Sequence, residues 1–130
     1  MSKLRMKVSK SRKNNLANKK IGYVARLITN GTASLDEMAE NASRNTTLHK
    51  AELKMAFEML MEEVANMLVQ GYIVDLGRVG KIYPRCTSNW VEKASDLSLD
   101  DVKPTLYYRP GDDIAGAVRS AVLQWSEGNS

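Results

Sequence analysis

The sequence predicts an α+β fold in which a helical centre is flanked by β-strands. Apolar and polar residues alternate in residues 4–8 and 21–27, as is typical of strands with one buried face. Apolar residues recur at helical spacing through residues 48–69, and short alternating runs punctuated by glycine follow. A chain of 130 residues with one cysteine can bury a core without disulfides, so we expect a single domain.

Basic charge is concentrated at the N-terminus. The first thirty residues hold nine of the nineteen Lys and Arg residues and none of the fifteen acids, so the rest of the chain is acidic. A basic segment on an acidic body can face a polyanion while the body stays soluble. Residues 9–20 are predicted to form a long hairpin loop between the two strands, which would bring together Lys10, Arg12, Lys13, Lys19 and Lys20.

Two helices are predicted in the centre of the chain. Ser34 and Glu37 form a capping box that begins the first helix, which should end near Arg44. The second helix begins either at Thr47, which is the better capping side chain, or at His49. The sequence leaves both starting points open.

The second helix is apolar on more than half of its circumference and should end before Gly71, since glycine suits the backbone conformation that follows a helix. Such a helix is usually buried on two sides, here against its own sheet and against a second copy of the chain. A central helix in a monomer is the alternative. The residues predicted to form the dimer interface are Phe57, Leu60, Met61, Val64 and Leu68.

The C-terminal part of the chain alternates again. We predict strands at residues 72–76, 81–83 and 105–109, of which the first two are joined by a tight glycine turn. A polar connection, residues 86–102, precedes the last strand. A final helix should open at Asp112, with an apolar face made of Ile114, Ala117, Val118, Ala121, Val122 and Trp125.

The residue types argue against an enzyme. One histidine, one lone cysteine and scattered acids provide no nucleophile, general base or metal-binding cluster. We therefore expect no catalytic residue, no cofactor, no metal and no small-molecule substrate. No apolar run could span a membrane or serve as a secretory signal, so we expect a cytoplasmic protein with no membrane partner.

Three segments of the chain, taken in order, carry a resemblance to a known family. They are the helix pair that ends at Gly71, the run VDLGRVGKI at residues 74–82, and the run LYYRPG at residues 106–111, which an amphipathic helix follows. Over roughly residues 34–123 the chain resembles the HU and integration host factor family of bacterial histone-like, nucleoid-associated DNA-binding proteins. The resemblance implies a helical hairpin, a small antiparallel sheet with an arm and a short C-terminal helix, assembled as an intertwined homodimer.

The same resemblance implies phosphate contacts at Gly80, Lys81 and Arg109, because cationic side chains and open backbone suit a polyanion. The family's arm is basic and carries a proline that kinks DNA, whereas residues 86–102 hold four acids, one lysine and no proline. The resemblance and the charge pattern together predict the DNA-binding residues. They are Lys7, Lys10, Arg12, Lys13, Lys19, Lys20, Arg26, Arg78, Gly80, Lys81, Arg85 and Arg109.

We therefore expect one HU-like domain with a basic N-terminal β-hairpin extension at residues 1–30, a body at residues 31–125 and a tail at residues 126–130. The favoured function is sequence-tolerant DNA binding by an architectural homodimer that neutralises phosphates in the bacterial nucleoid. The alternative is an HU-like structural or protein-interaction dimer that has lost DNA binding. A paralogue in place of the second copy is left open.

Overall fold

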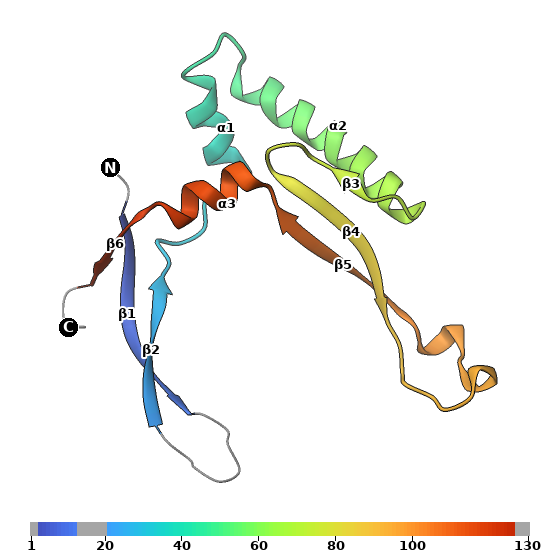
Figure 1. The fold of residues 1–130 in the computed structure, drawn as a ribbon. Coiled ribbons are helices and arrows are strands. Elements are labelled where there is room, and N and C mark those ends of the chain that lie inside the picture. Colours follow the sequence, from blue (N-terminus) through green and yellow to red (C-terminus); the bar gives the residue numbers. More distant parts are fainter. Residues whose placement is uncertain (1–2, 13–20, 127–130) are drawn as a thin grey trace. The chain divides into compact units, whose positions relative to one another are not determined.

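The computed structural model describes residues 3–12 and 21–126 (Figure 1). The chain forms two compact units. Unit 1 joins the two ends of the chain, Met1–Ala33 and Ala117–Ser130, and unit 2 is Ser34–Gly116. Each unit contains a three-stranded sheet, and the helices confirm the α+β class that the sequence predicts.

Unit 1 is built around a β-hairpin. Strand β1, Lys3–Arg12, pairs antiparallel with β2, Ile21–Ile28, which confirms both predicted N-terminal strands. The pairing continues as far as Arg12 opposite Ile21, so residues 9–12 belong to the strand and not to the predicted loop. The rest of that loop, residues 13–20, lies outside the described residues.

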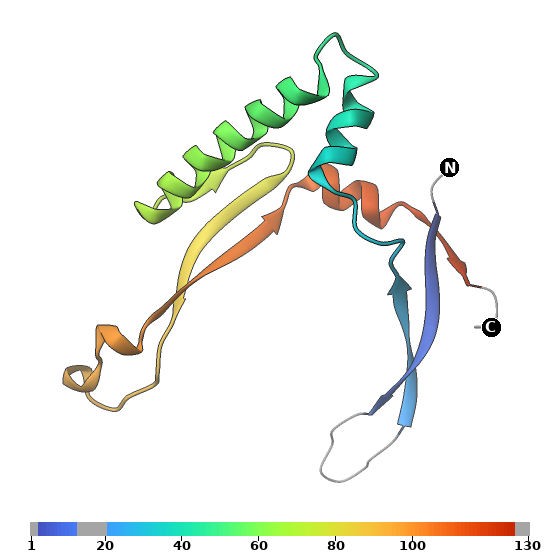
Figure 2. The same ribbon diagram turned by 180° about the vertical axis from the view of Figure 1, so that it is seen from behind.

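The C-terminal segment differs from the prediction. Helix α3, Asp112–Arg119, ends early, and Val122–Trp125 form strand β6 instead of a last helical turn. Strand β6 pairs in parallel with β1, on the side away from β2, as Figure 2 shows from behind. The pairing supplies partners for the backbone groups at the open edge of β1, a gain that helical periodicity within residues 114–125 does not reveal.

The helical hairpin of unit 2 follows the prediction closely. Helix α1, Leu35–Ser43, is capped by the Ser34 hydroxyl, which accepts a hydrogen bond from the Glu37 backbone N–H at 3.1 Å. Helix α2, Lys50–Val69, begins after His49, which settles the choice left open by the sequence. It ends in a Schellman motif around Gly71, whose φ is 90°.

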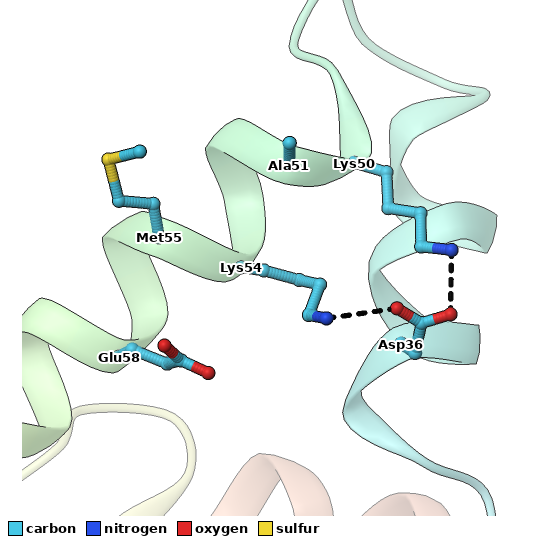
Figure 3. Close-up of a pocket in the computed structure, with 6 residues that line it drawn as sticks. All are labelled: Asp36, Lys50, Ala51, Lys54, Met55 and Glu58. Carbon is cyan, nitrogen blue, oxygen red and sulfur yellow. Dashed lines mark hydrogen bonds and ion pairs between the residues drawn. The ribbon is translucent and has the colours of Figure 1, made fainter.

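Ion pairs tie the two helices together (Figure 3). The two carboxylate oxygens of Asp36 on α1 lie 2.6 Å from Lys50 Nζ and 3.0 Å from Lys54 Nζ on α2. Hydrogen bonds to Lys50 and then to Lys54 lower the pKa of Asp36, and the Asp36 carboxylate in turn raises the pKa of Lys50. The cluster joins the helices of the hairpin at its surface.

The sheet of unit 2 has the strand order β3-β4-β5 and is antiparallel. Strand β3 is only Val74–Asp75, shorter than the predicted strand at residues 72–76, while β4 is Gly80–Thr87 and β5 is Lys103–Pro110. The short β3 leaves the outer edge of β4 unpaired beyond Ile82. That gap accommodates Pro84, which has no N–H to donate.

Candidate nucleic-acid interface

The β4–β5 ribbon of unit 2 has two chemically different faces. Residues paired across the ribbon point to the same side, and successive residues alternate. One face carries Ile82, Pro84, Leu106 and Tyr108, of which Pro84 and Leu106 line a groove beside α2. The other face carries all four basic residues of the two strands, and neither strand contains an acid. We call this second side the cationic face and define it by Lys81, Tyr83, Arg85, Lys103, Tyr107 and Arg109.

Aromatic side chains lie between the charges of the cationic face. Tyr83 is directly opposite Tyr107, with ring centroids 6.0 Å apart. The Arg85 guanidinium carbon stands 3.9 Å from the centroid of the Tyr107 ring, within the range of a cation–π contact. The guanidinium lies over the Tyr107 ring, and this contact does not use its N–H groups, which remain available to an anion.

Lys81 and Arg109 lie directly opposite each other at the end of the ribbon near the glycine turn. They line a shallow depression of about 260 Å³ together with Gly80, Tyr83, Pro110 and Asp112. Neither side chain forms an ion pair with any residue that the structure describes. Like charges placed directly across a sheet repel, and an anion between them would relieve that repulsion.

Gly80 has a structural role that explains its position. Its φ is 130°, and a Cβ atom there would meet the Arg109 carbonyl oxygen and would lie 2.8 Å from the Gly111 backbone nitrogen. The Gly80 N–H donates to the Gly77 carbonyl at 3.2 Å, so it is already engaged in the turn. Gly80 therefore lets the turn and β5 approach each other closely, and its own N–H is not open.

The other predicted site residues are distributed differently. Arg78 lies 3.2 Å from the Asp113 carboxylate, an exposed ion pair that offsets its charge. In unit 1, Lys7 is directly opposite Arg26, whereas Lys10 lies on the other face of the sheet. Arg12 occupies the last register position of β1, and three residues lie outside the described part of the chain: Lys13, Lys19 and Lys20.

Sequence reasoning missed Lys103, Tyr83 and Tyr107. The signal was present, because Lys81, Tyr83 and Arg85 recur at every second residue, as do Lys103, Thr105, Tyr107 and Arg109. Reading the two runs as complete strands would have placed each set on one face. The strands were predicted too short for that pattern to emerge.

The connection between β4 and β5 is acidic and exposed. It contains two short 3₁₀ helices, Ala94–Asp96 and Leu99–Asp101. The side chain of Trp90 in the same connection is 84 % exposed. Its four acids, Glu92, Asp96, Asp100 and Asp101, separate it chemically from the cationic face.

The predicted dimer residues lie along α2 with unequal burial. Val64 is buried, while Phe57 is 44 % and Leu60 is 56 % exposed. Beside the C-terminal end of the helix, an apolar groove of about 480 Å³ runs between α2 and the ribbon, and Val69 and Leu106 are among its lining residues.

Two further findings concern the described residues as a whole. No helix among them has both the length and the apolar character needed to cross a membrane. In residues 3–12 and 21–126, no group of three or more His, Cys, Asp or Glu side chains is arranged to hold a metal ion.

The fold and the cationic ribbon together define an HU-like protein. Over residues 3–124 the chain matches the family described as HU domain fused to wHTH, Ig, or Glycine-rich motif, and it belongs to that family. No curated protein matches the chain.

A solved structure supports the same fold. It is a crystal structure from Bacteroides vulgatus ATCC 8482, of a protein provisionally described as a bacterial DNA-binding protein, with a TM-score of 0.66 and 12 % sequence identity. The match covers 79 % of this chain and 43 % of that protein, so the chain spans less than half of its length.

Proposed function

We propose that this protein binds duplex DNA without sequence preference, as an HU-like homodimer that neutralises backbone phosphates. One observation carries the proposal. All four basic residues of the β4–β5 ribbon lie on one face, and no acid occurs in either strand. A cationic surface whose charges form no ion pair with a described residue suits a closely spaced row of phosphates.

The chemistry of the face favours backbone contacts over base reading. Lysine and arginine neutralise phosphates and release condensed counterions, and this gain does not depend on base sequence. No helix rich in Arg, Asn and Gln is available among the described residues for a major groove. Because residues 86–102 contain no proline, we propose binding with at most modest bending and no proline wedge.

Membership of the HU-like family and the likeness to the Bacteroides protein support DNA as the partner. We propose that residues 1–130 act as one HU-like domain, whose N-terminal extension adds the predicted cations at Lys7, Lys10, Arg12, Lys13, Lys19, Lys20 and Arg26. Gly80 contributes by shaping the turn, and Arg78 contributes once Asp113 releases it. A DNA partner would place the protein in the bacterial nucleoid.

The test is a titration of duplex DNA at several salt concentrations with the wild-type chain and with the double variant Lys81→Gln/Arg109→Gln. The variant should weaken binding at low salt, and the slope of log affinity against log salt should fall by about 2 for each protomer that contacts the duplex, since each lost phosphate contact removes about 0.9. Affinity for unrelated duplex sequences should fall equally, because phosphate contacts carry no sequence information.

A matched control removes the same charge elsewhere in unit 2. Arg44 and Lys93 lie off the cationic face, so Arg44→Gln/Lys93→Gln should leave the slope nearly unchanged. If both variants weaken binding equally, binding depends only on net charge, and the assignment of the cationic face as the DNA-binding site is wrong. If the wild-type chain fails to bind duplex at low salt, the protein is instead an HU-like interaction dimer that has lost DNA.

A further inference from the structure

The sheet of unit 1 has one strongly basic face. Strand alternation and register place Lys3, Arg5 and Lys7 of β1 on the same side as Arg26 of β2, and all four side chains are exposed. We call this set the unit 1 basic face. The opposite face of the same sheet is largely apolar and includes Leu4, Met6, Val8, Ala25, Leu27, Leu123 and Trp125.

The charges on the unit 1 basic face lack a counter-charge. Lys7 and Arg26 are directly opposite each other in the antiparallel pair, an arrangement that destabilises a sheet unless something neutralises it. The described part of unit 1 contains no Asp or Glu, and none of the four side chains forms an ion pair with a described residue. Any bound counter-charge therefore comes from outside that part of the unit.

Arg5 is positioned on this face by a neutral partner. Its Nη2 donates a hydrogen bond to the Asn30 Oδ1 atom at 2.6 Å. The bond orients the guanidinium without neutralising it. Arg5 also lines a hollow of about 370 Å³ beside β6, so its remaining donors face open space.

The spacing of the cations fits an extended polyanion. Strand geometry places Lys3 and Lys7 about 14 Å apart along β1, and a DNA duplex carries about eight phosphates along that length. The four cations are spread over a strand surface and do not converge on one point. They match a row of phosphates better than a single small anion.

We infer that the unit 1 basic face is a second duplex-binding surface, so that one chain holds two duplex segments, one on each unit. This inference rests on the proposed function, in which the cationic face of unit 2 takes the first segment. The two faces share no residue and belong to separate compact units. Each unit therefore has its own set of phosphate-binding charges.

The test is a bridging assay with short duplexes. One duplex is fixed to beads and saturated with protein, and capture of a second, fluorescent duplex is measured at low salt. The wild-type chain should capture the second duplex. For the same amount of protein retained on the fixed duplex, Lys7→Gln/Arg26→Gln should reduce capture of the second duplex by about tenfold or more. Arg44→Gln/Lys93→Gln, which removes the same charge from unit 2, should capture normally.

The outcomes separate this inference from the proposed function. If the wild-type chain binds no duplex, the proposed function fails first. If it binds duplex but captures none, or if Lys7→Gln/Arg26→Gln captures as well as wild type, the second surface is wrong and the proposed function stands. Thermal unfolding without DNA checks the fold: because the variant relieves a like-charge pair, its midpoint should not fall, and a large fall would overturn the claim that these charges are unneutralised.

Discussion

Single glycines determine how closely the turn and β5 of unit 2 can approach. A Cβ atom at Gly80 would collide with the backbone of Arg109 and Gly111. A Cβ atom at Gly111 would likewise collide with the carbonyl group of Arg78. The two glycine-containing motifs that carry the HU-like resemblance are therefore interlocked backbone segments. Their sequence pattern reflects packing.

A substitution at Gly80 tests this packing. Gly80→Ala should lower the free energy of unfolding by at least about 2 kcal/mol, because alanine is strained at a φ of 130° and its Cβ would collide with backbone. Chemical denaturation measures the change. The control is Gly116→Ala in α3, where an added Cβ meets nothing within 4 Å and alanine should stabilise by about 0.5 to 1 kcal/mol. Equal effects at both sites would contradict this role of Gly80.

At the scale of the element, the helical hairpin has a contribution to stability that depends on pH. The pKa of Asp36 is lowered from its ordinary value of 3.8 by hydrogen bonds to Lys50 and Lys54. A depressed carboxyl pKa gives stability that is fully present above pH 3.8 and is lost as the pH falls through the folded-state pKa. Acid should therefore weaken the contact between α1 and α2.

The variant Asp36→Asn removes this titration. Its melting temperature should lie below that of wild type near neutral pH, and the two should converge in strong acid, where wild-type Asp36 is protonated. Thermal unfolding followed by circular dichroism from about pH 7 to about pH 2 measures the difference. Glu63→Gln, an exposed residue of α2 outside every described ion pair, is the control. A difference that stays constant across the whole range would rule out the Asp36 contacts as its cause.

Deletion of the N-terminal segment would be a misleading test of DNA binding, because it would also disrupt a sheet. Strand β1 is the central strand of the unit 1 sheet, so deleting residues 1–20 would remove the partner of both β2 and β6. Loss of binding after such a deletion could reflect loss of the sheet. Charge substitution on exposed side chains separates charge from fold, which is why Lys7 and Arg26 are changed to glutamine.

At the scale of the whole molecule, the small number of buried side chains argues for an assembly. Among the described residues only Ala39 and Val64 are buried hydrophobic side chains. A folded chain of this length ordinarily buries about two thirds of the surface that it exposes when unfolded. The apolar side chains left open on α2, such as Val69 at 88 %, are consistent with a second copy covering them.

The proposed homodimer can be tested through α2. Light scattering at micromolar concentration should give about twice the chain mass of 14.5 kDa, and Leu60→Asp should shift the protein toward the monomer because it places a charge in the proposed interface. Asn66→Asp adds the same charge to an exposed polar position of α2 and should remain dimeric. A wild-type monomer at this concentration, or equal behaviour of both variants, would refute the interface.

The sequence by itself determined the helical hairpin, the N-terminal strands, the glycine turn and the HU-like class, because capping, alternation and turn chemistry act over a few residues. Only the tertiary structure decided that residues 122–125 are a strand, since their partner β1 lies at the other end of the chain. It also decided which cations share a face. The face on which each cation lies depends on how β4 pairs with β5 and how β1 pairs with β2. These pairings join residues that are distant in sequence.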